Sequence, residues 1–342
     1  MLTSVVTGAA GFVGQALVRR LLAEGDAVRA IVLRGDPSIA ELRRLASDPS
    51  MLAIFEGDIT STDSMTRAFE SADRVFHTAA LVHAWAPRST FERVNIFGTR
   101  NVAELSLAHG IPKVVAISTS DVYGLPQPGV VIDERSPHRP WGEPYADTKI
   151  EAERWLWRLQ RESGLPVSVI YPGWVYGPGD KAFFPGLAKA IRARQMVFWG
   201  KDIRLPFVYI ENLVDAILLA AQSPRAVGNG YLVFDTQQGP TFEQLCARIA
   251  TAVGAPAPTR RIPYQLALKA AGWLESIWRV ARRKSPPPLL RVDVKAFGLQ
   301  WEFSNEKIRR ELGWQSRVSM EAGLEAALRD LQARVGGPAA HA

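Results

Sequence analysis

Short apolar runs alternate with longer segments of helical spacing through the first half of this chain. The apolar runs end near Gly, Asp or Ser and cover 2–8, 27–33, 51–58, 73–80, 113–120 and 166–173. The segments with apolar residues at helical intervals are 11–25, 39–47, 64–71 and 94–110. Repeated strand–helix–strand units predict an α/β fold, with a doubly wound (Rossmann) parallel sheet covered by helices on both faces.

The second half of the chain is less regular. Residues 204–222 predict a strand, a turn and a helix, and 230–236 predict a late strand that joins the sheet. From residue 240 the pattern is mainly helical, with a break at 284–290. This predicts a smaller, mainly helical C-terminal substrate domain.

These patterns predict domain boundaries as well. We expect a nucleotide-binding domain over 1–172, to which 206–236 return. The expected substrate-binding domain consists of 173–205 and 237–332. The last ten residues, 333–342, are rich in Ala and Gly and predict a disordered tail.

Composition places the chain among ordinary globular proteins. It has 342 residues, of which 47% are hydrophobic and 22% charged. No window of about 18 residues lacks charge, so a membrane-spanning helix is not expected. The first residues have no basic segment typical of a signal peptide. The single cysteine, Cys246, excludes an internal disulfide and is expected to be a buried thiol, so we predict a cytoplasmic location.

The net charge of +7 raises the question of an anionic partner. The basic residues are spread along the chain except for a cluster at 279–284. No zinc-ligand spacing, RNA-binding signature or long basic arm accompanies them. We therefore expect neither nucleic-acid binding nor a metal site.

A glycine-rich loop lies at the first predicted strand–helix junction. Gly8, Gly11 and Gly14 follow one another at intervals of three in "TGAAGFVG". A tight turn at this place lets backbone N–H groups and the positive end of a helix meet a phosphate. The alternative is a tight turn with no ligand, because a lone glycine pattern is weak evidence.

The end of the second predicted strand bears on the choice of nucleotide. An acidic residue there would bind the ribose 2′-hydroxyl of NAD, but Arg34 follows Leu33 at this place and would accommodate the 2′-phosphate of NADP. NADP is therefore favoured over NAD, although Arg34 is also explained as a solvated surface residue. Asp58 and Ile59, after the third strand, are candidates to contact the adenine, and capping of the next helix is the alternative for Asp58.

A tyrosine and a lysine stand four residues apart in "EPYADTKIEAERW". A helical pattern places Tyr145 and Lys149 on one face. Ser118, Thr119 and Ser120 follow the fifth predicted strand, at the sheet edge where doubly wound folds bind their ligands. A phenol beside an ammonium suits proton transfer, because a nearby positive charge lowers the pKa of a tyrosine. A surface pair is the alternative.

Taken together, these motifs resemble the extended short-chain dehydrogenases/reductases, the NAD-dependent epimerase/dehydratase family. The matching segments, spread over nearly the whole chain, are "TGAAGFVG", "GDIT", "HTAA", "VNIFGTRNV", "STSDVYG", "YADTK", "YPGWVYGPGD", "RLPFVYIENLVDAI" and "NEKIRRELGWQSRVSMEAGL". The resemblance implies a Thr119–Tyr145–Lys149 mechanism. Tyr145 would exchange a proton with the substrate oxygen, Lys149 would lower its pKa and bind the nicotinamide ribose, and Thr119 would hold the substrate oxygen. Ser118 and Ser120 stay open as alternatives to Thr119.

The resemblance also implies further cofactor contacts. They involve the backbone N–H groups of Phe12 and Val13, and Ala79, Ala80 and Pro172 at strand ends, together with the positions already named. The family commonly has Asn where this chain has His77 or Thr78. Asn95 is expected behind the site, with a buried amide that satisfies backbone groups as the alternative.

The sequence around the site favours one reaction class. Dehydratases of the family carry Thr-Asp-Glu where this chain has Thr119, Ser120 and Asp121, so dehydration is disfavoured. The segment 261–314 resembles 3β-hydroxysteroid dehydrogenase-like and 3-oxoacid reductase-like members. We predict interconversion of a hydroxyl and a ketone on a hydrophobic substrate, with Trp85, Trp141 and Trp174 in substrate loops. The alternatives are a nucleotide-sugar 4-epimerase with bound NAD and a non-catalytic nucleotide-binding protein.

Two partner predictions remain. The segment 264–284 combines Leu, Trp and Ile with a basic end, which is typical of a helix in a membrane interface, although a helix that covers the substrate cleft explains it too. Relatives often pair through the long helices of the first domain. The resemblance therefore implies a homodimer.

Overall fold

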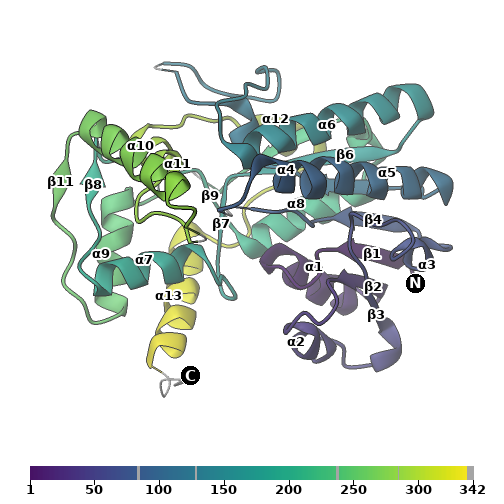
Figure 1. Ribbon diagram of the computed structural model, residues 1–342. Helices are drawn as coiled ribbons and strands as arrows, with labels where there is room; N and C mark the ends of the chain where they lie inside the picture. Colours follow the sequence, from purple (N-terminus) through teal and green to yellow (C-terminus); the bar gives the residue numbers. More distant parts are fainter. Residues whose placement is uncertain (83–84, 128, 236–238, 284, 337–342) are drawn as a thin grey trace.

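The computed structural model describes residues 1–82, 85–127, 129–235, 239–283 and 285–336 (Figure 1). Its centre is a seven-stranded sheet in the order β10-β6-β5-β4-β1-β2-β3. All of its pairings are parallel. The strands are β1 (Thr3–Thr7), β2 (Ala27–Val32), β3 (Leu52–Glu56), β4 (Arg74–His77), β5 (Val114–Ile117), β6 (Val167–Pro172) and β10 (Gly230–Val233). The predicted Rossmann sheet is confirmed.

Successive strand residues point into two different cores, because side chains alternate across a sheet. Val6 packs with Leu17 of α1 and with α8 on one face, whereas Val5 packs with Val102 of α5 on the other. The helices of the sheet region are α1 (Phe12–Ala23), α2 (Ile39–Arg43), α3 (Thr66–Phe69), α4 (Arg88–Phe91), α5 (Gly98–Ala108), α6 (Pro144–Ser163) and α8 (Ile210–Gln222). Both faces of the sheet are therefore buried, as a parallel sheet requires.

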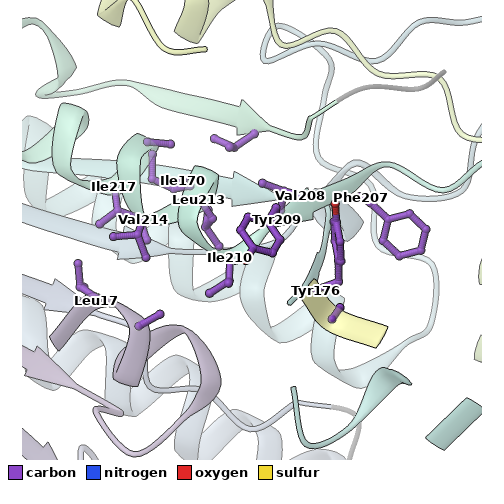
Figure 2. Close-up of a cluster of buried hydrophobic side chains, with 14 of the residues drawn as sticks. Leu17, Ile170, Tyr176, Phe207, Val208, Tyr209, Ile210, Leu213, Val214 and Ile217 are labelled. Carbon is purple, nitrogen blue, oxygen red and sulfur yellow. The ribbon is translucent and has the colours of Figure 1, made fainter. Parts of the chain in front are cut away.

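Helix α8 is central to the first of these cores. Figure 2 shows Leu213, Val214 and Ile217 of α8 between Ile170 of β6 and Leu17 of α1. The late strand β10 pairs with β6 from Gly230 to Val233. Residues far along the chain thus complete the sheet; the division into two domains stays a prediction.

The remaining elements form the mainly helical C-terminal region (Figure 1). They are α7 (Phe183–Arg192), α9 (Phe242–Ala252), α10 (Tyr264–Val280), α11 (Arg291–Gly298) and α13 (Met320–Gly336). The helix α12 (Glu306–Leu312) packs instead against β10 and α8 of the sheet region. Two small parallel sheets pair β7 (Trp174–Tyr176) with β9 (Phe207–Tyr209), and β8 (Phe198–Trp199) with β11 (Arg261–Ile262).

Two details differ from or refine the sequence predictions. The expected helix at 94–110 is a π-helical stretch, Glu92–Phe97, followed by α5. The expected tail is wrong for 333–336, because α13 continues to Gly336, and 337–342 lie outside the described residues. Cys246 is buried in α9, as expected. No helix within the described residues has the length and apolar character needed to cross a membrane.

Candidate active site

The glycine loop closes tightly between β1 and α1. Gly8 has φ +67°, and a Cβ on it would lie 2.7 Å from the backbone of Ala79; a Cβ on Gly14 would lie 2.2 Å from the carbonyl oxygen of Gly8. Gly11 caps α1 with no side-chain hydrogen bond, and no acidic residue lies in the first turn. The first N–H groups of a helix lack partners within it, so those of Phe12, Val13 and Gly14 suit an anion. The loop therefore fits a dinucleotide pyrophosphate.

The strand ends beside this loop carry the other nucleotide candidates. The side chain of Arg34 is 92% exposed, with Nε 3.7 Å from the carboxylate of Glu56. Asp58 is exposed too, and one of its carboxylate oxygens accepts a hydrogen bond from the N–H of Thr60 at 2.8 Å. This bond belongs to a local turn and does not cap a helix, because α3 begins only at Thr66.

Ile59, the residue after Asp58, contacts the helix α5. It is buried, and a Cβ on Gly98 would lie 2.5 Å from its side chain. Asn101 donates its amide to the Ile59 carbonyl oxygen at 2.9 Å. Asn101 was not predicted from the sequence. It lies on α5 three residues after Gly98, the other residue of this helix that contacts Ile59. The loop is thus positioned by contacts that only the fold brings together.

The N-terminus of α6 is built to carry Tyr145 and Lys149. Glu143 caps the helix by accepting a hydrogen bond from the N–H of Ala146 at 2.7 Å, and Pro144 occupies the first turn. Tyr145 and Lys149 lie one turn apart, and both are buried. The surface-pair alternative is therefore wrong.

Three successive turns of α6 meet three successive residues at the end of β5. The hydroxyls of Tyr145 and Thr119 are hydrogen-bonded. The ammonium of Lys149 donates to the carbonyl oxygen of Ile117 at 2.8 Å. One turn further on, the buried carboxylate of Glu153 accepts a hydrogen bond from the hydroxyl of Ser118.

These contacts give the three candidate hydroxyl residues at 118–120 different neighbours. Ser118 turns to Glu153, Thr119 turns to Tyr145, and Ser120 lines a cavity beside them. Among the three, Thr119 is hydrogen-bonded to the candidate tyrosine. Sequence reasoning missed Glu153, whose signal was its position four residues after Lys149 on the same helical face.

A cavity lined mostly by aromatic and aliphatic side chains adjoins Ser120. Its lining comes from the β5 end, the loop before α6, β7 and α11: Ser120, Asp121, Trp141, Trp174, Pro206, Val292, Asp293, Ala296, Trp301 and Phe303. The indole of Trp141 donates to the Asp121 carbonyl oxygen at 3.1 Å, which fixes the ring beside the site. Two of the three predicted tryptophans thus lie in this cavity.

Trp85 lies elsewhere. Its indole donates to the carbonyl oxygen of Arg283 at 3.0 Å, after the end of α10. It is not among the residues that line the described cavity, whereas Trp301, which sequence reasoning did not name, is. Trp301 follows α11 by only a few residues, and its place in the cavity depends on the packing of that helix.

Comparison with known proteins identifies the family. Residues 4–233 match the model of the NAD dependent epimerase/dehydratase family. The chain belongs to this family. The predicted resemblance is confirmed, and the family's association with NAD agrees with the fit of the glycine loop.

Curated relatives of this family member match nearly its whole length. One is 4-hydroxy-2-methyl-3-oxo-4-farnesyl-3,4-dihydroquinoline-1-oxide ketoreductase of Stigmatella aurantiaca, 31% identical, with 94% of each chain covered. A second is 2-alkyl-3-oxoalkanoate reductase of Stenotrophomonas maltophilia, 30% identical over 94% of this chain and 96% of the relative. A third is 3 beta-hydroxysteroid dehydrogenase/Delta 5-->4-isomerase of Mycobacterium tuberculosis, 30% identical over 94% and 88%.

Two polar side chains, His77 and Thr78, stand at the end of β4. His77 bridges the hydroxyls of Thr7 and Thr99 at 2.8 and 2.9 Å. Burial, with a smaller effect of the Lys149 charge, lowers the pKa of His77 to about 3, so its ring is neutral. The hydroxyl of Thr78 donates to the Thr7 carbonyl oxygen at 2.7 Å. Both side chains thus hold β4 to β1.

Asn95 also has a structural role. Its amide group exchanges two hydrogen bonds with the backbone of Leu81, at 2.8 and 3.1 Å, and donates to the hydroxyl of Thr148 at 3.1 Å. The alternative given from the sequence, a buried amide that satisfies backbone groups, is the one observed. It ties the loop after β4 to α6. Ala79, Ala80 and Pro172, at the ends of β4 and β6, stay predicted cofactor contacts.

The electrostatics of Tyr145 differ from the expectation. Burial, reinforced by the charges of Asp121 and Glu143, raises the pKa of Tyr145 above its ordinary value. The expected net lowering is not found, because desolvation of the phenolate outweighs any stabilisation by Lys149. Burial lowers the pKa of Lys149 to about 8, although the Glu153 carboxylate acts in the opposite direction.

Proposed function

We propose that this protein is an NAD(P)-dependent oxidoreductase that interconverts a hydroxyl and a ketone on a hydrophobic substrate through Thr119, Tyr145 and Lys149. The hydrogen bond between Thr119 and Tyr145, next to a cavity lined by Trp141 and Trp174, is the observation that carries the proposal. A bound nicotinamide would supply or accept the hydride. The substrate carbonyl would lie between that ring and the two hydroxyl groups.

Tyr145 is protonated at neutral pH, because burial raises its pKa further above the ordinary value. A protonated phenol can donate to the oxygen of a ketone. Thr119 would hold that oxygen, and the positive charge of Lys149 would stabilise the phenolate that remains. We infer ketone reduction as the direction of the reaction, because two relatives are named as a ketoreductase and a reductase.

The substrate class follows from the cavity and the relatives. An aromatic lining with few polar groups suits an apolar ligand, and the relatives' names include a farnesyl quinoline, an alkyl oxoalkanoate and a steroid. A panel of hydrophobic ketones and nucleotide sugars, assayed by nicotinamide absorbance with NADPH and NADH, tests this. We expect stoichiometric cofactor oxidation with a hydrophobic ketone. Conversion of a nucleotide sugar without net cofactor change would instead identify an epimerase.

We further infer a homodimer through the surface of α5 and α6. Phe97, just before α5, is 53% exposed, and Trp155 of α6 lies between the guanidinium groups of Arg100 and Arg158, each 4.7 Å from its ring. Sedimentation equilibrium should give twice the monomer mass, and Phe97→Ser should shift the equilibrium toward monomer. A wild-type monomer at high protein concentration would contradict this inference.

Peripheral membrane contact through α10 belongs to the same proposal. Leu266, Trp273, Ile277 and Val280 form a stripe on α10 and are 54–86% exposed. The opposite face, at Ala267 and Ala271, is buried. An exposed apolar stripe next to basic residues suits a lipid interface. Exposed Lys269, Arg279, Arg282 and Arg283 add positive charge that anionic lipids attract.

Vesicle sedimentation tests the α10 surface. We expect binding to phosphatidylcholine vesicles that contain phosphatidylglycerol, and weaker binding without the anionic lipid. Trp273→Gln with Ile277→Ser should abolish it. Val131→Ser, a control at a 56% exposed residue elsewhere, should not. Equal binding of both variants would exclude α10 as the contact.

A further inference from the structure

The carboxylate of Glu153 is enclosed behind the proposed catalytic lysine. Glu153 is 2% exposed. Besides the Ser118 hydroxyl, the hydroxyl of Tyr171 donates to it at 2.9 Å, and Nδ1 of His138 lies 3.6 Å from it. Trp157, one turn further along α6, also hydrogen-bonds to it. Such a set of donors stabilises a carboxylate that water does not reach.

Three aromatic rings form the wall of this enclosure. The centroids of Tyr123, His138 and Tyr171 lie 5.1–5.7 Å apart, with edge-to-face geometry throughout. The rings come from the β5 end, the loop before α6, and β6. Burial, with the charge of Arg154, lowers the pKa of His138 to about 4, so this ring is neutral at neutral pH. Burial and nearby carboxylates raise the pKa of both tyrosines, which stay uncharged.

Lys149, one turn before Glu153 on α6 and likewise buried, is a cation whose charge acts on Glu153. The charge of Arg154 lowers the pKa of His138, and the charges of Asp133 and Glu134 raise the pKa of Tyr123. Burial opposes the charged forms of both partners: it raises the pKa of Glu153 to about 7 and lowers that of Lys149 to about 8. Each charge offsets part of the desolvation of the other. A buried ammonium without this partner would lose its proton more readily.

We propose that Glu153 is a positioning residue that keeps Lys149 charged and, through Ser118, holds the strand end that carries Thr119. Two contacts to consecutive residues support this: Lys149 binds the carbonyl oxygen of Ile117, and Glu153 binds the hydroxyl of Ser118. The catalytic consequence rests on the proposed function, in which Lys149 stabilises the phenolate of Tyr145. The charge relation between Glu153 and Lys149 does not depend on that function.

The test is the titration of Lys149 in Glu153→Gln. Carbon-13 labelling of lysine, with the signal assigned by Lys149→Arg, reports this titration by NMR. Glutamine keeps the shape but has no charge, and only its Oε1 accepts a hydrogen bond, so one of the two hydroxyls of Ser118 and Tyr171 must rotate to accept from Nε2. The Lys149 titration should move down by about one pH unit. In the absorbance assay, the alkaline limb of the kcat profile should move down equally. A Lys149 titration unchanged from the wild type would overturn the proposal.

Matched variants separate charge from structure. Glu151→Gln removes an exposed carboxylate on the same helix that pairs with Arg88, and should leave Lys149 unchanged. Glu153→Asp keeps the negative charge, so Lys149 should titrate closer to its wild-type pH in this variant than in Glu153→Gln. If Glu153→Gln does not fold, Ser118→Ala removes one donor, favours protonation of Glu153, and should move the Lys149 titration in the same direction by less. A shifted titration in a protein without turnover would refute the proposed function and leave this inference standing.

Discussion

The junction of β5 with α6 and the pair α10–α11 are built in opposite ways. At the junction, the buried polar groups of Tyr145, Lys149 and Glu153 each bond to the strand end. In the helical pair, the core is a small apolar cluster, Ala267, Ala271 and Val294. The carboxylate of Glu275 accepts hydrogen bonds from the backbone N–H and from Nε of Arg291. Directional bonds fix distances that proton transfer requires, whereas apolar packing adapts to the shape of a substrate.

This contrast predicts a division of effects. Changes at the junction should lower kcat and leave substrate binding intact, because they act on the transition state. Changes in the cavity beside α11 should raise KM and alter kcat little. The following variants test the division, from the largest expected effect to the smallest.

Tyr145→Phe removes the proposed proton donor. General acid–base catalysis contributes about 10²- to 10⁴-fold, so kcat should fall by this factor while nucleotide affinity, measured by fluorescence titration, stays within about threefold. The phenyl ring keeps the packing, so the melting temperature serves as the control for folding. Undiminished turnover would remove Tyr145 from the mechanism.

Gly14→Ala places a Cβ where only 2.2 Å separates it from the Gly8 carbonyl oxygen. The loop must move, and losing one or two charge-assisted hydrogen bonds to the pyrophosphate should weaken nucleotide binding about 100-fold by calorimetry. Gly186→Ala is the control, because nothing lies within 4 Å of a Cβ there. Equal nucleotide affinity in the two variants would argue against this loop as the phosphate site.

Trp174→Ala opens the apolar side of the cavity. Trp174 packs against Phe183 and Phe297, with centroids 5.0 and 4.9 Å away. An aromatic contact of about 1.4 kcal/mol corresponds to a tenfold rise in KM for a hydrophobic ketone, with kcat within about twofold. Trp278→Ala, on α10 and outside the cavity, is the control. A fall in kcat at constant KM would break the proposed division.

Arg34→Glu should have the smallest effect, because the side chain is almost fully exposed. An exposed charge contributes about 1 kcal/mol, so NADP affinity should fall about fivefold and NAD affinity should change little. Calorimetric titration with both nucleotides measures this. Equal changes for the two would remove Arg34 from the choice of cofactor.

The parallel sheet and the Tyr145–Lys149 pair were predictable because their signals are local. Alternating strand and helix periods predicted the sheet, and a four-residue interval predicted the shared face of α6. The partners of Lys149 and Glu153 were not predictable, since Ile117 and Ser118 are 32 and 35 residues away along the chain. The raised pKa of Tyr145 was missed for a related reason: a sequence shows neighbouring charges, whereas burial depends on the whole fold.

Transfer of deuterium from C4 of a labelled nicotinamide tests the central claim most directly. The enzyme is incubated with a hydrophobic ketone and NADPH or NADH that carries deuterium at both C4 positions, and the product alcohol is analysed by mass spectrometry. The account predicts one deuterium on the carbinol carbon for each cofactor oxidised, and loss of this transfer in Tyr145→Phe. Product without deuterium, or conversion with no net oxidation of the cofactor, would contradict it.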